Sequence, residues 1–218
     1  MNSITVPMII DDLGALLLFT MILIIAAGQI YRAIYAVAAQ SLLIAVAGAI
    51  LAKATRNVDL WVIAGVTLVV KAVALPWILH GVVKRMDVRR EMDPVIPVSL
   101  TLALSVLIAM MSFHLNASLG SVRQTITGNA LPVGIALTLM GVLVMATRRA
   151  ALTQMVGLFA SENGIFFTAM AVTRGMPFII EIGVILDVIL AALVMTIMLL
   201  RVRSTVDADI ADLSRLRG

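Results

Sequence analysis

A single carboxylate stands in the middle of a long apolar stretch, Met155-Val-Gly-Leu-Phe-Ala-Ser-Glu-Asn-Gly-Ile-Phe-Phe167. This carboxylate is Glu162, and the next apolar stretch, 178–201, carries Asp187 near its middle. A charged side chain at the centre of a membrane helix costs about 2.5–3.5 kcal/mol on insertion scales. Two carboxylates at the centres of consecutive stretches therefore point to a function inside a membrane.

The composition is that of an integral membrane protein. Of the 218 residues, 62% are hydrophobic and 13% are charged, which is more apolar surface than a soluble domain of this length can bury. Backbone polar groups in lipid must be satisfied within the chain, so we predict an all-α membrane bundle. It has about seven spans, at 12–30, 34–52, 59–80, 95–115, 130–147, 151–173 and 178–201.

The distribution of Lys and Arg predicts the orientation. Eleven lie on one side of these spans (Arg32, Lys84, Arg85, Arg89, Arg90, Arg148, Arg149, Arg201, Arg203, Arg215 and Arg217), and four lie on the other (Lys53, Arg56, Arg123 and Arg174). The positive-inside rule makes the richer side cytoplasmic, with the N-terminus outside and the C-terminus in the cytoplasm. We assign the formal net charge of +4 to helix ends and lipid headgroups, not to nucleic acid.

The sequence also gives the depth of the buried charges. Glu162 lies 13 residues from Arg149, Asp187 lies 14 from Arg201, and Lys71 lies 13 from Lys84. At a rise of about 1.5 Å per residue, each is about 20 Å from its cytoplasmic anchor. We therefore expect Glu162, Asp187 and Lys71 to share one level near the bilayer midplane, with Glu162 and Asp187 on adjacent helices and facing the protein interior.

A proton path is one interpretation of these residues, and a structural one stands beside it. In the first, Glu162 and Asp187 take up and release protons, and Lys71 changes the free energy of protonation by about 2 kcal/mol across about 8 Å. In the second, the same groups only lock helices together by hydrogen bonds or ion pairs. Glu181, about 9 Å nearer the outer surface, is either a relay entry or an interfacial carboxylate.

Two further features bear on this layer. Pro76, five residues after Lys71, is expected to open the third helix locally. A loose internal repeat would pair Gln40 and Lys71 with Glu162 and Asp187. On this interpretation the chain divides into an N-terminal three-helix unit at 1–94, a linking helix and outer loop at 95–129, and a second three-helix unit with a cytoplasmic tail at 130–218.

Redox chemistry has few candidate ligands in this chain. There are no cysteines, which excludes thiolate-held iron–sulfur and nickel sites and disulfides within the chain. The two histidines, His80 and His114, lie near the ends of apolar segments without a metal-ligand spacing, and we interpret them as interfacial side chains. No cofactor is therefore expected in the chain itself.

The C-terminal part of the sequence resembles a known family. The segment 148–163, with its Arg148-Arg149 doublet and Glu162, resembles the second helix of the K subunit of complex I. The segment 186–195 with Arg201, and the ending Leu216-Arg217-Gly218, resemble that subunit's third helix and C-terminus. The C subunit of multisubunit cation/proton antiporters shares the pattern. Asp187 stands where the K subunit has a glutamate, and its side chain is one methylene shorter.

The longer chain is similar to component E of hydrogenase-4, a membrane subunit of formate hydrogenlyase-type group 4 [NiFe] hydrogenases. That resemblance covers nearly the whole chain, most closely from Leu131 onward, and rests on Tyr31-Arg32, Gln40, Lys71, Pro76, Glu162-Asn163-Gly164, Glu181-Ile-Gly183 and Asp187. It implies a non-catalytic membrane-arm subunit in a bacterial cytoplasmic membrane, contributing Glu162, Asp187, Lys71 and Glu181 to a proton path.

The resemblance also implies partners. Antiporter-like and other membrane-arm subunits would continue the lateral chain of charges, and soluble hydrogenase subunits would hold the nickel–iron and iron–sulfur centres. Two alternatives stay open: a subunit of a cation/proton antiporter or another complex I relative, and a purely structural assembly subunit.

Overall fold

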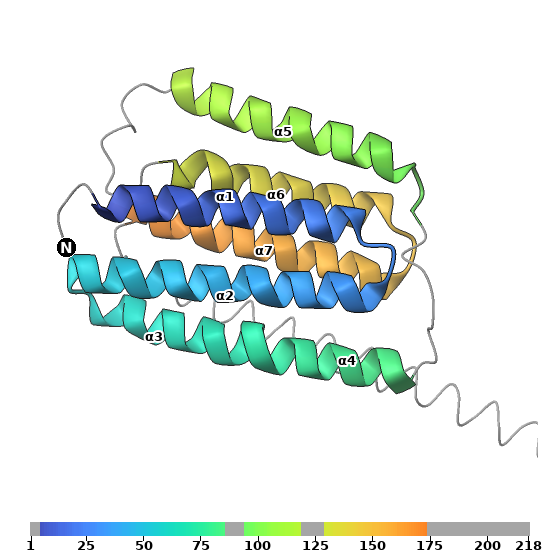
Figure 1. Ribbon diagram of the computed structural model, residues 1–218, viewed down its shortest axis with the longest axis horizontal. Helices are drawn as coiled ribbons and strands as arrows, with labels where there is room; N and C mark the ends of the chain where they lie inside the picture. The colour runs from blue at the N-terminus through green and yellow to red at the C-terminus, as the bar shows by residue number, and fades with distance from the viewer. Residues whose placement is uncertain (1–4, 86–93, 119–128, 174–218) are drawn as a thin grey trace, which may run out of the picture. The chain divides into compact units, whose positions relative to one another are not determined.

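The computed structural model describes residues 5–85, 94–118 and 129–173, all of which belong to one unit, Met1–Pro177. Every regular element in these ranges is helical, as the sequence predicts (Figure 1). The elements are α1 (Thr5–Ala26), α2 (Ile30–Thr55), α3 (Val58–Val66), η1 (Thr67–Ala74), α4 (Leu75–Arg85), α5 (Val98–Ser118), α6 (Ala130–Thr147) and α7 (Ala151–Thr173).

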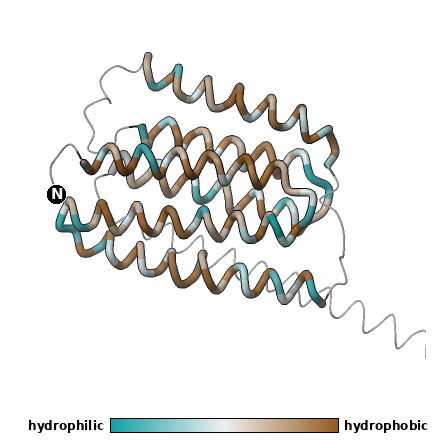
Figure 2. The backbone as a smooth tube through the Cα atoms, viewed as in Figure 1, coloured by the Kyte–Doolittle hydropathy of each residue, from teal (hydrophilic) through white to brown (hydrophobic). Residues whose placement is uncertain are grey.

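Five helical segments are long and apolar enough to cross a membrane: Val6–Ala26, Ile30–Thr55, Val58–Gly81, Val98–Ala117 and Ala130–Thr147. Hydrophobic residues dominate the middle of these helices, and hydrophilic residues gather toward their ends (Figure 2). A sixth helix, α7, has 23 residues and carries Ser161-Glu162-Asn163 in its middle. The seventh expected span, 178–201, lies outside the described residues. The three-unit division of the chain stays a prediction.

The expected boundaries were wrong at the first two spans. Helix α1 begins at Thr5, not at 12, so Asp11 and Asp12 lie within it. Pro7 is compatible with this early start because the first amides of a helix have no intrahelical acceptor. Asp11 also has a partner there, since its Oδ1 accepts a hydrogen bond of 2.7 Å from the backbone amide of Asn129, just before α6. Helix α2 begins at Ile30, so Tyr31 and Arg32 lie in its first turn.

Contacts between helix ends fix the direction of the passes. Arg148, which follows α6, donates from Nη2 to the carbonyl of Ile25 near the end of α1, at 2.7 Å. The amide of Val95, shortly before α5, donates to the carbonyl of Thr147 at the end of α6, at 2.8 Å. The ends of α1 and α6 and the beginning of α5 therefore share one side. The Asp11–Asn129 bond joins the beginnings of α1 and α6 on the other.

Helices α6 and α7 pack so closely that their backbones touch. A methyl group added at Gly141 would meet the backbone of Ser161 and lie 2.7 Å from the carbonyl oxygen of Gly157. One added at Gly157 would lie 2.8 Å from the carbonyl oxygen of Gly141 and 2.8 Å from the amide nitrogen of Met145. Small residues allow this approach, which is a common basis of helix association in membranes. The contact fixes the position of α7, which carries Glu162.

We predict that Gly141→Ala destabilises the protein by about 1–3 kcal/mol, the usual cost of overpacking a filled contact. The matched control is Gly65→Ala in α3, where an added methyl group would meet nothing within 4 Å. That change should be neutral or slightly stabilising because alanine favours the helix. Reversible unfolding of the full chain in mixed detergent micelles measures both. Equal stability of the two variants would contradict the close α6–α7 contact.

Candidate functional site in the middle of the bundle

Glu162 is positioned by the packing of α7 against α6. The α7 residues in close contact with α6 are Gly157, Ser161, Gly164 and Thr168, at helical spacings of four and three. Glu162 follows Ser161, about 100° further around the helix, and so points away from α6. Its side chain is 3% exposed. The expectation that Glu162 faces the protein interior is confirmed, whereas Asp187 lies outside the described residues.

Lys71 lies in an irregular part of the third pass. The helix changes to a π-helix over Thr67–Ala74, where the amide of Leu75 donates to the carbonyl of Val70, five residues earlier. Pro76 follows directly and has no amide hydrogen to donate, so regular α-helical bonding cannot continue through it. The expected local opening before Pro76 is confirmed. Short π-helical segments occur frequently at functional sites.

The structure brings these two residues into direct contact. Lys71 Nζ lies 3.1 Å from Glu162 Oε1, and both side chains are almost fully buried. The ammonium group also lies 5.4 Å from the centre of the Phe166 ring, a distance that allows a favourable cation–π interaction. The expectation of a common depth for Lys71 and Glu162 is confirmed. The contact is much shorter than the distance of about 8 Å used to estimate the interaction of Lys71 with a neighbouring carboxylate, because the lysine extends across the interface.

An amide network lies beside the ion pair. Asn163 Nδ2 donates to Gln40 Oε1 and to Ser41 Oγ on α2, both at 3.1 Å. Gln40 is 0% exposed, and Ser41 and Asn163 are each 1% exposed. The sequence analysis names Gln40 in the repeat and Gln40 and Asn163 in the family resemblance, but it does not predict Gln40, Ser41 or Asn163 as site residues. The available signal was a polar residue at the centre of each apolar run.

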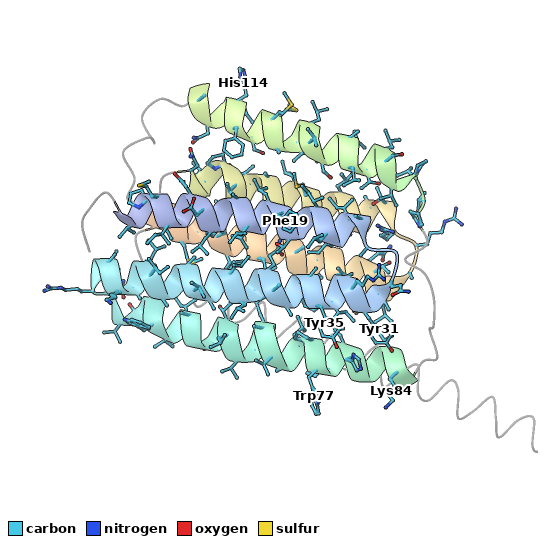
Figure 3. The ribbon with its side chains drawn as sticks, in the orientation of Figure 1. Phe19, Tyr31, Tyr35, Trp77, Lys84 and His114 are labelled. Carbon is cyan, nitrogen blue, oxygen red and sulfur yellow. The ribbon has the colours of Figure 1, made fainter. Side chains whose placement is uncertain are left out.

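The remaining sequence candidates fall in two groups. Glu181 and Asp187 lie outside the described residues, so their part in the layer stays a prediction. His80 and His114 are exposed side chains on α4 and α5. The His80 ring packs with Tyr31 at a centroid distance of 4.9 Å, and Tyr31 and Tyr35 extend from α2 toward α4 (Figure 3). His80 lies nine residues after Lys71, about 13 Å along the helix, with the buried side chains of Leu75 and Leu79 between them.

Arg148 closes one end of the bundle. Besides its bond to Ile25, its carbonyl oxygen accepts a hydrogen bond from Gln154 Nε2 at 2.9 Å. Burial lowers the pKa of the Arg148 guanidinium from its ordinary value, but arginine stays protonated in proteins. The Arg148 guanidinium therefore joins the end of α6 to α1, and its backbone carbonyl joins it to the beginning of α7.

The chemistry available to the central site is proton binding. The Glu162 carboxylate lies 3.1 Å from the Lys71 ammonium group, and adding a proton to this carboxylate would remove the negative charge that attracts the ammonium group. Within the described ranges no group of three or more His, Cys, Asp or Glu side chains is arranged to hold a metal ion.

Comparison with known proteins shows that the sequence is similar to that of a mycobacterial protein. No protein-family model matches the sequence, and no solved structure does. The uncharacterized protein Rv0085 of Mycobacterium tuberculosis (strain ATCC 25618 / H37Rv) is 32% identical over 152 residues, which is 69% of this chain and 69% of that protein. The chain belongs to the family of this mycobacterial protein.

The ion pair predicts a measurable energetic coupling. Removing one member of a buried pair leaves the other charge uncompensated, whereas removing both leaves none. Lys71→Met and Glu162→Gln should therefore together cost less than the sum of the two single changes, by about 0.5–3 kcal/mol. The free energies of unfolding of the wild type, the two single variants and the double variant in mixed micelles measure this coupling in a double-mutant cycle.

A second cycle is the control. Lys53→Met and Asp59→Asn remove opposite charges from exposed positions near helix ends, where no ion pair joins them within the described residues. These two changes should be additive. Additivity in the Lys71–Glu162 cycle as well would contradict the contact at the centre of the bundle.

Proposed function

We propose that this chain is a non-catalytic membrane-arm subunit of a group 4 hydrogenase or another complex I-like complex, and that Glu162 and Lys71 form one station of its proton path. The observation that carries the proposal is the buried contact of 3.1 Å between Lys71 Nζ and Glu162 Oε1. Ionisable pairs within membrane bundles commonly mark ion and proton pathways. The resemblance of the sequence to hydrogenase-4 component E supports the same assignment.

The proposed step uses the coupling between the two charges. At 3.1 Å and an effective dielectric constant of about 20, their attraction is about 5 kcal/mol before desolvation is subtracted. A proton that reaches Glu162 converts the carboxylate to a carboxylic acid and cancels this attraction. Lys71 then loses the attraction of this carboxylate, which favours transfer of a proton onward from the layer. Departure of the proton from Glu162 restores the pair.

The position of Lys71 in the chain favours a movement of its side chain away from Glu162 and back. It extends from the π-helix Thr67–Ala74, where the helical bonding is already irregular. Small shifts between π- and α-helical bonding require less rearrangement there than in a regular helix. Glu162 stands on α7, whose backbone is held against α6. In this mechanism the lysine moves and the carboxylate stays in place.

The proposed setting in the membrane follows from charge. Among the described residues, Arg32, Lys84, Arg148 and Arg149 lie at one end of the helices, and Lys53 and Arg56 lie at the other. The positive-inside rule then favours the first end as cytoplasmic in a bacterial inner membrane, with the N-terminus outside. A seventh span at 178–201 would bring Asp187 to the layer, place Glu181 about 9 Å nearer the outer surface, and leave the C-terminus in the cytoplasm.

The proposed partners follow from the resemblance to hydrogenase-4 component E. The resemblance implies that soluble partner subunits hold the nickel–iron and iron–sulfur centres, which is consistent with the lack of thiolate ligands in this chain. Antiporter-like membrane subunits would receive protons from this layer. Recovery of hydrogenase subunits with an affinity-tagged chain would support the hydrogenase assignment, and recovery of antiporter subunits alone would support the cation/proton antiporter alternative.

A structural role is the second candidate, because an ion pair that only holds helices together would also be a direct contact. Buried pairs contribute little net stability compared with apolar packing, but they can fix which helices associate. Under this alternative the pair stays charged throughout, and only assembly depends on it.

We predict that Glu162→Gln leaves the assembled complex at normal amounts and strongly reduces proton translocation. The amide keeps the size and hydrogen-bonding capacity of the acid but cannot take up and release a proton at working pH. Electron transfer in detergent, where there is no gradient to oppose, should change less. Glu162→Asp should retain part of the activity because it keeps an ionisable acid.

Proton uptake by sealed vesicles containing the complex decides between the two roles. The matched control is Asp59→Asn, which removes a carboxylate from an exposed position at the beginning of α3 and should pump normally. Wild-type pumping by Glu162→Gln would end the proton-path hypothesis for this residue. Loss of assembly in that variant, with Asp59→Asn intact, would favour the structural lock.

A further inference from the structure

The amide network on α2 and α7 leaves two buried polar atoms without a hydrogen bond inside the described part of the chain. Asn163 uses its Nδ2 to donate to Gln40 Oε1 and Ser41 Oγ. Gln40 Nε2 and Asn163 Oδ1 then have no partner, although their side chains are 0% and 1% exposed. Almost all buried polar groups in proteins are paired with protein or with water. These two atoms therefore require an explanation.

The result does not depend on which end of each amide carries the nitrogen. If oxygen and nitrogen are exchanged in both amides, Gln40 donates to Asn163, and the Ser41 hydroxyl donates to the same oxygen. Both contacts survive, but Asn163 Nδ2 and Gln40 Oε1 are then the two atoms left over. In either arrangement one donor and one acceptor remain. A water molecule, which donates and accepts, satisfies both.

We propose that Gln40, Ser41 and Asn163 form a water-binding site beside Glu162 and that its water delivers protons to that carboxylate. The inference rests on the proposed function. Lys71 approaches Glu162 from η1, whereas the amides lie on α2 and at the next position of α7. The amide site therefore lies on a different pair of helices from the lysine and includes the residue next to Glu162 in the sequence.

The transfer step is balanced within the water chain. An excess proton carried by the bound water passes to a Glu162 carboxylate oxygen, so that an O–H bond of the hydronium ion breaks as the O–H bond of the acid forms. A neutral water molecule remains in place. Gln40 and Asn163 do not ionise. They are positioning residues, which hold the water at the orientation that the transfer needs.

Two substitutions at Gln40 give opposite expectations for a water site and for a packing role. Gln40→Met fills nearly the same volume and offers no strong hydrogen-bonding group, so it leaves no place for the water. Gln40→Ser is smaller and polar and makes room for more water. If Gln40 only packs, the serine variant should be the worse of the two because it leaves a cavity. If it holds water, the methionine variant should be the worse in proton uptake.

We expect proton uptake by vesicles with the Gln40→Met complex to fall about tenfold, the equivalent of about 1.4 kcal/mol in the barrier. Gln40→Ser should retain most of the rate. The matched control is Thr20→Val: Thr20 is also buried, but its hydroxyl donates to the carbonyl of Leu17 in its own helix, and uptake should be unchanged. Gln40→Met at wild-type rate, or Gln40→Ser slower than Gln40→Met, would overturn the proposal.

A structure of the wild-type complex at a resolution that shows ordered water supplies a test independent of transport. Water within hydrogen-bonding distance of both amides is expected, and amides packed without it would overturn the proposal even if Glu162 proves essential. If Glu162→Gln pumps normally, the proposed function fails. The presence of the bound water is then decided by the high-resolution structure of the complex alone. Failure of Gln40→Met to assemble leaves the serine variant and the structure to decide.

Discussion

Two opposite charges held in contact inside a hydrocarbon layer are the constraint on which this structure depends. Neither Lys71 nor Glu162 can reach water along its own helix, since each is about 20 Å from the basic residues at the helix ends. The free energy of burying them is recovered only if the two helices hold the charges together. The glycine contact of α6 with α7, the π-helix before Pro76 and the amide network on α2 all lie around this pair. The bundle can be understood as the scaffold that keeps it in place.

The two members of the pair differ in how firmly the surrounding structure holds them. Glu162 is carried by a helix whose backbone touches its neighbour at Gly141 and Gly157, so its position is fixed by packing. Lys71 lies in a segment with irregular helical hydrogen bonding, and its own side chain is long and flexible. Under the proposed function, a change in the charge of Glu162 would change the position of Lys71. Such a coupling is what a proton station requires, and a static lock has no need for it.

Much of the architecture could be predicted from the sequence, because membrane helices are apolar over a length that the bilayer sets. The residue spacing to flanking arginines and lysines was enough to place Lys71 and Glu162 at one level, and the spans 130–147 and 151–173 agree with α6 and α7. The first span was expected to begin at 12 because the charges of Asp11 and Asp12 interrupt the apolar pattern, whereas α1 begins at Thr5. In the structure Asp11 binds the amide of Asn129, a partner 118 residues away that no local pattern reveals.

The details of the site were less predictable, for a similar reason. Direct contact between Lys71 and Glu162 depends on the path of a four-carbon side chain across a helix interface, which spacing along one helix does not specify. The bonds from Asn163 to Gln40 and Ser41 depend on how α2 and α7 face each other. Asp187, expected in the same layer, and Glu181, expected nearer the outer surface, lie outside the described residues and stay predictions.

The most direct measurement of the central claim is the protonation state of Glu162 during turnover. Infrared difference spectroscopy of the complex in membranes, with and without electron donor, detects the carbonyl stretch of a protonated carboxyl group. The account predicts a carboxyl band that changes during turnover, shifts in deuterated water and is absent in Glu162→Gln. A difference spectrum identical in the wild-type and Glu162→Gln complexes would contradict it, because Glu162 would then keep one protonation state while the complex works.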